Sequence, residues 1–135
     1  MDRYIIAIYL RLSVEDKRVE SMSIESQRLL LRKYAEVLGD NVEIIEYVDN
    51  GYSGTNLERP AVQQLLNDVK AYRVNCILVK DFSRFGRNSI EVGYFTQQIF
   101  PLFGVRFISV SDNYDSDEHK GDTGGIAVAV KYLVN

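Results

Sequence analysis

The stretch CILVKDFSRFGRN, residues 76–88, begins as an apolar strand and ends with two arginines three residues apart. Its first four residues form a continuous apolar run, which favours a strand buried on both faces. An arginine directly after a strand is most often a solvated charge or the partner of a surface carboxylate. The alternative is that Arg84 and Arg87 belong to a binding site at the end of the strand, and the rest of the chain decides between the two.

Segments with strand-like and helix-like patterns alternate along the chain. The apolar runs of strand length occupy residues 4–10, 42–48, 76–79 and 105–110. The segments with helical spacing run from a cap at Ser23 to Gly39, from Pro60 to Tyr72, and from Asn88 or Ser89 to a stop or bend at Pro101. The apolar stripe of the second of these helices is predicted to consist of Val62, Leu65, Leu66, Val69 and Tyr72. This alternation predicts an α/β domain with an open, mainly parallel sheet of four to five strands and helices on both faces.

Composition limits the class of protein. A chain of 135 residues with 46% hydrophobic content can bury a core as one domain without disulfides or metals. Its 16 basic and 19 acidic residues give a net charge of -3, so it lacks the basic excess of a free-standing nucleic-acid-binding domain. The single cysteine, Cys76, excludes a disulfide framework. No signal peptide or long apolar span occurs, which predicts a cytoplasmic protein and no membrane partner.

The last part of the sequence has a different character. Residues 112–122 are polar and acidic and predict a mobile loop. From Thr123 the sequence is typical of the start of a helix, although its AVAV segment equally suits a strand. Because no capping signal follows, we expect the chain to be a fragment of a longer protein.

Polar residues follow three of the predicted strands. In open α/β sheets, ligands bind in the crevice beyond the carboxyl ends of the strands, so these residues should meet at one edge. They are Arg11 and Ser13 after the first strand, Asp49, Ser53 and Arg59 after the second, and Arg84 and Arg87 after the third. Since an arginine fork fits phosphate by paired hydrogen bonds, the four guanidinium groups predict a phosphate site.

Three of these polar residues have simpler interpretations. Ser13 is in a position where serine commonly forms a local turn with the backbone. Gln27 interrupts the apolar stripe of the first helix and is either a satisfied buried amide or a group that positions a reacting atom. Asp49 either holds an arginine or supports the glycine-bearing loop that follows it.

Several common kinds of active site are absent from the sequence. His119 is the only histidine and lies in the acidic run, which argues against a Ser-His-Asp hydrolase. Neither GxxxxGK[ST] nor GxGxxG occurs, so the two commonest nucleotide cradles are missing. Carboxylates cluster only at residues 112–118, so no metal site is expected elsewhere. A serine acting on a phosphate held by arginines is the chemistry that remains.

Four segments occur in an order that resembles the serine site-specific recombinases of the resolvase/invertase family. They are YLRLS (residues 9–13), SIESQ (23–27), DNGYSGTNLERP (49–60) and KDFSRFGRN (80–88). The chain looks most similar to the catalytic domain of the large serine recombinases, the integrases of transposons and phages. The resemblance implies that residues 1–135 form a resolvase-type catalytic domain and that a dimerisation helix begins near residue 123.

The resemblance also implies roles for individual residues. Ser13 matches the nucleophile that attacks a DNA phosphodiester and keeps the 5'-phosphate as a phosphoserine. The arginines that match the family's active site are Arg11, Arg59, Arg84 and Arg87, Gln27 matches a motif glutamine, and Tyr9, Asp49 and Ser53 are supporting residues. No metal or other cofactor is implied, and the implied partners are double-stranded DNA and copies of the same protein in a dimer and a synaptic tetramer. The implied processes are integration, excision or transposition; the alternatives are a silent assembly module of the same fold and a phosphate-sensing α/β domain.

One position departs from the family pattern. Small resolvases carry an aspartate directly before the first arginine of their DR.GR motif, and this sequence has Ser83 there. Asp81, two residues earlier, is a candidate replacement. The sequence therefore leaves open which group donates a proton to the leaving oxygen.

Overall fold

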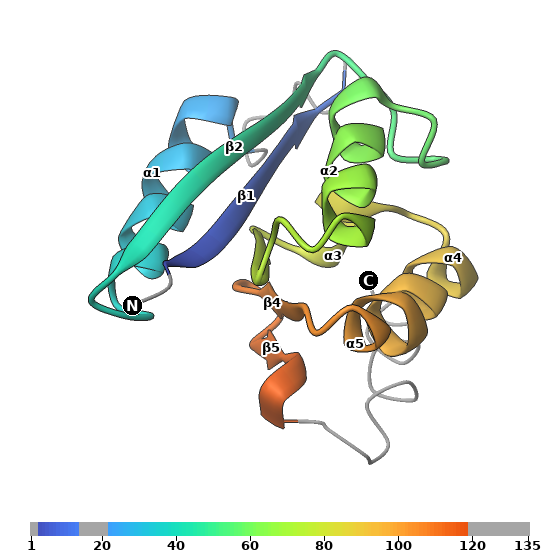
Figure 1. Cartoon of the computed structure of the whole chain (residues 1–135). Coiled ribbons are helices and arrows are strands. Elements are labelled where there is room, and N and C mark those ends of the chain that lie inside the picture. Colours follow the sequence, from blue (N-terminus) through green and yellow to red (C-terminus); the bar gives the residue numbers. More distant parts are fainter. Residues whose placement is uncertain (1–2, 14–21, 119–135) are drawn as a thin grey trace.

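A single twisted sheet organises the molecule in the computed structural model, which describes residues 3–13 and 22–118. The strand order is β2-β1-β3-β4-β5, and all neighbouring pairs are parallel except β4 and β5. The strands are β1 (Tyr4–Leu12), β2 (Val42–Asn50), β3 (Cys76–Val79), β4 (Arg106–Ser109) and β5 (Tyr114–Asp115). The predicted fold class, an open and mainly parallel α/β sheet, is confirmed (Figure 1).

The long strand β1 lies between β2 and β3 and explains the continuous apolar run at the start of the chain. Residues 6–10 are completely buried, because helices cover both faces of the strand. Ile6, Ile8 and Leu10 belong to one core and Ala7 and Tyr9 to the other. The strand continues two residues beyond the predicted end, since residues 11 and 12 pair with residues 49 and 50 of β2.

Helix α1 (Ile24–Glu36) covers one face of the sheet. Its N-cap is Ser23, whose hydroxyl accepts a hydrogen bond from the Ser26 amide, as the sequence predicts. Leu31 and Ala35 pack in the same core as Ile6, Ile8 and Leu10 of β1. The helix ends at Glu36 and not at the predicted Gly39.

The other helices lie on the opposite face, as Figure 1 shows. They are α2 (Pro60–Lys70), α3 (Phe82–Phe85), α4 (Ser89–Tyr94), the π-helical segment η2 (Phe95–Ile99) and α5 (Phe100–Leu102). Asn88 caps α4 by accepting a hydrogen bond from the Glu91 amide. The wide turns of η2 end two residues before Pro101, whose ring would clash with the Gln97 carbonyl in a regular α-helix. The short helix α3 was not predicted.

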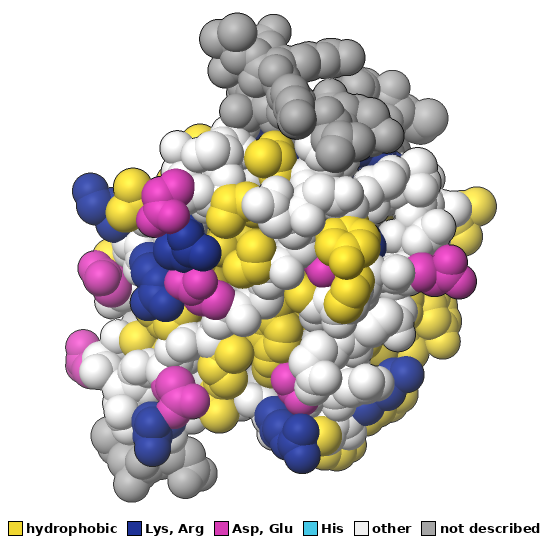
Figure 2. All heavy atoms as spheres, turned by 90° about the horizontal axis from the view of Figure 1, so that it is seen from above, with side chains coloured by type: hydrophobic (Ala, Val, Ile, Leu, Met, Phe, Trp, Pro, Cys, Tyr) yellow, Lys and Arg dark blue, Asp and Glu magenta, His cyan; other side chains and the backbone are white. Residues whose placement is uncertain are grey.

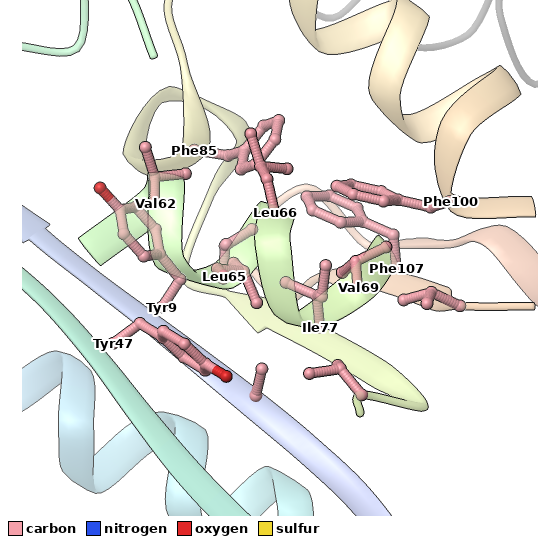
Figure 3. Close-up of a cluster of buried hydrophobic side chains, with 14 of the residues drawn as sticks. Tyr9, Tyr47, Val62, Leu65, Leu66, Val69, Ile77, Phe85, Phe100 and Phe107 are labelled. Carbon is pink, nitrogen blue, oxygen red and sulfur yellow. The ribbon is translucent and has the colours of Figure 1, made fainter. Parts of the chain in front are cut away.

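The predicted apolar stripe of α2 is confirmed except at its last member. Proline occupies the first turn, and the four apolar residues Val62, Leu65, Leu66 and Val69 are buried (Figure 3). Tyr72 was expected to continue the stripe, and this is wrong. It follows the end of the helix with a φ of 59°, is 72% exposed, and rests its ring 5.3 Å from that of Phe103.

A cluster of phenylalanines anchors the segment that follows β3. The Phe85 ring is completely buried and lies 5.5 Å from the ring of Phe107 and 5.7 Å from that of Phe100. The Phe82 ring is stacked on Phe107 as well, at 6.1 Å. Because both aromatic residues of α3 are inserted into the core, the arginines beside them are carried on a rigid support.

The prediction of a mobile loop at residues 112–122 is wrong for the part that the structure describes. Residues 114–115 form β5, and a 3-10 turn, η3 (Ser116–Glu118), follows. Arg106 of β4 binds Asp115 through two parallel hydrogen bonds of 2.9 and 2.5 Å, which fixes the edge strand. Residues 119–122 and the helix expected from Thr123 lie outside the described residues.

Within residues 3–13 and 22–118, no helix is long and apolar enough to cross a membrane.

Candidate functional site

The site lies where the strand order reverses. The chain leaves β1 toward β2 on one side and returns through α2 to β3 on the other, so the switch point falls between β1 and β3. Ligands of open α/β sheets bind beyond the carboxyl ends of strands at such a point. Residues 11 and 12 end β1 at this point and Ser13 follows them, while residues 81–87 come after the end of β3.

Arg11 is completely buried at the end of β1. Its guanidinium donates hydrogen bonds to three backbone carbonyls: Nη1 to Tyr52 at 3.0 Å, Nη2 to Ser83 at 2.7 Å and Nε to Arg84 at 3.0 Å. Two of these acceptors are more than 70 positions away in the sequence. Arg11 therefore joins the end of β1 to the loop after β2 and to α3.

Arg59 is the residue directly before α2 and is 2% exposed. Nε donates to the carbonyl of Asn56 at 2.9 Å, Nη1 donates to the carbonyl of Arg84 at 3.1 Å, and Nη2 donates to the carbonyl of Phe85. Nη1 also donates to the hydroxyl of Tyr9 at 2.8 Å. The Arg84 carbonyl thus accepts from both buried guanidiniums.

Tyr9 and Asp49 form a buried pair behind Arg59. The Tyr9 hydroxyl donates to Oδ2 of Asp49 at 2.7 Å. The same carboxylate accepts the amides of Ala61 and Val62 at 2.9 and 3.0 Å, which places its negative charge at the N-terminus of α2, where the helix dipole favours it. Burial is the main cause that raises the pKa of Tyr9, so its hydroxyl stays protonated and can donate at neutral pH.

Gln27 is a satisfied buried amide in this structure. Its Nε2 donates to the carbonyls of Arg11 and Met22, each at 3.0 Å, and its Oε1 accepts the Arg11 amide at 3.3 Å. These two partners lie on either side of Ser13 in the sequence. Gln27 therefore holds together the two ends of the segment that carries the serine.

Asp81 caps α3 and organises the residues around it. Oδ1 accepts the Ser83 hydroxyl at 2.6 Å and the Arg84 amide at 3.2 Å, and Oδ2 accepts Lys80 Nζ at 3.1 Å. Burial opposes ionisation of this carboxyl, but the hydrogen bond from Ser83 and the charges of Arg84 and Lys80 prevail and lower its pKa. Asp81 is therefore a carboxylate at neutral pH.

The side chains of Arg84, within α3, and of Arg87, after α3, lie in different environments. Arg84 is 6% exposed and donates from Nη1 to the carbonyl of Arg11 at 3.2 Å. Arg87 has an exposed side chain, and its amide donates to the carbonyl of Gly54 at 2.9 Å. A Cβ on Gly54 would lie 2.8 Å from Arg11 Nη2 and 3.2 Å from Arg87 Cγ, so the loop approaches both arginines because this residue has no side chain.

The two serines differ in what they do. Ser13 is 2% exposed and follows Arg11 by two residues. The Ser53 hydroxyl accepts the Thr55 amide and donates to the Thr55 hydroxyl, so it stabilises its own turn. The sequence predicts Ser53 to lie with the arginines, whereas in the structure its hydroxyl bonds to Thr55. The sequence patterns do not explain why residue 54 is a glycine, although the SG pair is part of the resemblance.

The arrangement suits an oxyanion. Four arginines lie at one edge of the sheet: Arg11, Arg59, Arg84 and Arg87. Two carboxylates, Asp49 and Asp81, lie with them, so the net charge of these six residues is positive. Figure 2 views the molecule from the side toward which β1 and β2 point, and the described surface there mixes basic and acidic side chains. The excess of positive charge is therefore local. Among the described residues, no group of three His, Cys, Asp or Glu side chains could hold a metal ion.

Comparison with known proteins agrees with this geometry. The family model described as "Resolvase, N terminal domain" matches residues 6–129. A "Putative DNA recombinase" of Bacillus subtilis (strain 168) is 34% identical over 82 residues, which cover 61% of this chain and 16% of that protein. The match thus spans about a sixth of that relative.

Solved structures give matches over more of the chain. The N-terminal catalytic domain of TP901-1 integrase is 31% identical with a TM-score of 0.76, covering 97% of this chain and 93% of that one. A resolvase family site-specific recombinase from Streptococcus pneumoniae is 29% identical with a TM-score of 0.73, covering 97% and 87%. The C-terminal catalytic domain of ISC1926 TnpA, an IS607-like serine recombinase, is 27% identical with a TM-score of 0.63, covering 78% and 68%.

The fold and these matches define a catalytic domain of the serine recombinase class. The chain belongs to the resolvase N-terminal domain family.

Proposed function

We propose that this chain is the catalytic domain of a longer site-specific DNA recombinase, with Ser13 as the nucleophile. The observation that carries the proposal is the gathering of four arginines at the end of β1, next to a buried serine, in a chain of this family. Integration, excision and transposition are the processes in which such a domain would act.

In the proposed reaction, Ser13 Oγ attacks the phosphorus of a DNA phosphodiester. The new Oγ–P bond replaces the P–O3' bond, so a 3'-hydroxyl leaves and the 5'-phosphate remains esterified to the protein. The Ser13 hydroxyl loses its proton to a water molecule as it attacks. Positive charge nearby makes this deprotonation easier and stabilises the non-bridging oxygens in the transition state. Because the phosphoserine ester conserves the energy of the cleaved phosphodiester, rejoining requires no ATP, and the mechanism uses no metal.

The proton for the leaving 3'-oxygen comes from a group other than Asp81 in this proposal. The lowered pKa of Asp81 makes it a poor acid at neutral pH, and its oxygens already bind Ser83, Lys80 and the start of α3. We assign Asp81 the role of orienting Ser83 and α3. An arginine or a water molecule is then the proton source.

The partners that we propose are double-stranded DNA and further copies of the protein. A helix beginning near residue 123 would join subunits into a dimer and a synaptic tetramer, and separate domains would bind DNA. The net charge of -3 supports this division, since non-specific DNA binding depends on phosphate neutralisation by basic residues. Such a protein would act in the cytoplasm of a bacterium.

The test is a search for a covalent protein–DNA adduct. The full-length protein is incubated with a library of random-sequence duplexes, denatured, and examined for DNA that stays attached and for the sequences that it carries. We expect an adduct with wild type and none with Ser13→Ala, which should still fold and bind DNA because it loses only one hydroxyl. An adduct with Ser13→Ala would refute the nucleophile assignment. Normal oligomers without any adduct would instead favour the silent assembly module.

A further inference from the structure

The acidic run at residues 112–118 has defined partners that the proposed function does not use. Asp115 and Asp117 both pair with Arg106, Asp115 through two hydrogen bonds and Asp117 at 3.3 Å from Nε. Asp112 has different donors, which come from the end of β4 and from the start of α3. Asp112 therefore connects β4 to the short helix that carries Arg84.

One oxygen of Asp112 makes this connection. Oδ2 accepts the Phe82 amide at 2.8 Å and the Ser109 hydroxyl at 2.6 Å. Phe82 is the first residue of α3 and lies 30 positions earlier in the chain, and Ser109 is the completely buried last residue of β4. Since the Ser109 hydroxyl belongs to the sheet, it holds the carboxylate in place for the Phe82 amide.

The turn that carries Asp112 is fixed to the sheet by its backbone. The amides of residues 110 and 111 donate to the carbonyls of residues 79 and 80 at 3.0 and 2.8 Å, which extends the parallel pairing of β3 and β4. The Asn113 amide then bonds to the carbonyl of residue 110 at 3.1 Å, with a φ of 54°, a left-handed conformation that asparagine tolerates well. The position of Asp112 is thus set by β3 and β4.

The start of α3 is bound by two carboxylates of different origin. Asp81 accepts the Ser83 hydroxyl and the Arg84 amide, but it directly precedes α3 and moves with it. Asp112 comes from the turn after β4, so its bond to the Phe82 amide fixes the helix relative to the sheet. Because α3 has only four residues, a displacement of its first residue is passed directly to Ser83 and Arg84.

Such a displacement would reach the candidate site. The Arg84 guanidinium donates to the carbonyl of Arg11, two residues before Ser13, at 3.2 Å. In the opposite direction, the Arg11 guanidinium donates to the carbonyls of Ser83 and Arg84 at 2.7 and 3.0 Å. A displacement of about 1 Å in a reacting constellation can reduce a rate about a hundredfold, so the place of α3 has direct consequences for catalysis.

We propose that Asp112 is a positioning residue of the reaction: oriented by Ser109, it holds the Phe82 amide and so sets the place of α3 beside the end of β1. The proposal rests on the proposed function, because it concerns the same site. Asp112 acts through the backbone of α3 and exchanges no proton with DNA.

Asp68 of α2 supplies a matched control. Its carboxylate accepts the Tyr47 hydroxyl at 2.7 Å, as the carboxylate of Asp112 accepts the hydroxyl of Ser109. Its other side-chain donors are Gln64 and Arg73, which lie within α2 and after its end. Asp112→Ala and Asp68→Ala therefore each remove a carboxylate that binds a hydroxyl, and only the first removes the acceptor of an α3 amide.

The first experiment measures hydrogen exchange of backbone amides in the 135-residue chain and needs no DNA. We expect Asp112→Ala to speed exchange of the Phe82 amide by about tenfold or more relative to the amides of β3, which report overall unfolding, because the lost bond was to a charged group. Asp68→Ala should leave this ratio unchanged. An unchanged ratio in Asp112→Ala would overturn the inference, whether or not the protein cleaves DNA.

The second experiment uses the full-length protein and measures the single-turnover rate of adduct formation on a duplex recovered from the random-sequence library. At saturating protein, Asp112→Ala should lower the rate between about tenfold and a hundredfold with unchanged DNA affinity, while Asp68→Ala keeps the wild-type rate. Asp112→Asn should restore most of the rate, because its side-chain oxygen can accept the same two bonds. A wild-type rate in Asp112→Ala would overturn the inference and leave the proposed function intact, whereas no adduct in wild type would refute the proposed function.

Ser109→Ala provides a second variant in case Asp112→Ala does not fold. It leaves the carboxylate in place and removes the hydroxyl that orients it, so it should slow adduct formation by a smaller factor, again with unchanged DNA affinity. A wild-type rate in Ser109→Ala would overturn the orienting role of Ser109.

The third experiment separates positioning from proton donation. A sulfur atom in place of the 3'-bridging oxygen at the scissile position leaves as a thiolate and needs no proton, so this substrate compensates for the loss of an acid. We expect the defect of Asp112→Ala to be as large on this substrate as on normal DNA. A defect that disappears would make Asp112 the proton donor and overturn its positioning role.

Discussion

Replacing Gly54 by alanine tests how tightly the site is packed around Arg11. The new Cβ would lie 2.8 Å from Nη2 of the Arg11 guanidinium, which is closer than real contacts allow, and 3.0 Å from its Cζ, which is tighter than most of them. The guanidinium ends a flexible side chain, but it cannot move away without weakening its hydrogen bonds to the carbonyls of Tyr52 and Ser83. One hydrogen bond to a charged group contributes about 1.5–3 kcal/mol, so we expect Gly54→Ala to lower the free energy of unfolding by about 2 kcal/mol.

The control for this variant is another glycine of the same chain. Gly93 lies in α4, and a Cβ added there would have no atom within 4 Å, so Gly93→Ala should raise stability by about 0.5–1 kcal/mol through the helix propensity of alanine. Urea denaturation of both variants gives the comparison, with equal slopes confirming that the unfolding reaction is unchanged. Stability of Gly54→Ala at or above that of wild type would refute the close packing of the loop against Arg11.

The remaining predictions concern α3. Phe85→Ala removes a fully buried ring and should lower the free energy of unfolding by about 3–5 kcal/mol. The control is Leu102→Ala, at a side chain that is 72% exposed, which should change the free energy of unfolding by less than about 0.5 kcal/mol. If urea denaturation gave similar values for the two variants, the packing of Phe85 would be contradicted. Asp81→Asn keeps the helix cap but loses the charge. Folding lowers the pKa of Asp81, so its contribution to stability is complete above the ordinary pKa of about 4 and is lost as the pH falls through the lower pKa of the folded state. The stability gap between wild type and Asp81→Asn should therefore stay constant at neutral pH and shrink as the pH falls below about 4. A gap that does not shrink in acid would argue against a depressed pKa.

Local patterns in the sequence determined most of the fold. The apolar run of β1, the cap at Ser23, the proline that begins α2 and the strand at residues 76–79 were all predicted within a few residues, because each depends on near neighbours in the chain. The meeting of the arginines at one edge also followed from the sequence, since carboxyl ends of parallel strands share an edge. Repeating polarity and turn chemistry are properties of short segments, so they can be recognised without the tertiary structure.

Contacts between distant segments were decided only by the tertiary structure. The Arg11 guanidinium binds one carbonyl that is more than 40 positions away in the sequence and two that are more than 70 positions away. Because every residue has a carbonyl, no residue type marks these acceptors in the sequence. The edge strand β5 depends on the ion pair between Arg106 and Asp115, which overcame the polar composition that predicted a loop. The sequence by itself therefore determined which elements form and which charges gather at the end of β1. The tertiary structure decided which of those charges are turned inward onto the backbone, because buried donors must find acceptors wherever the packed chain supplies them.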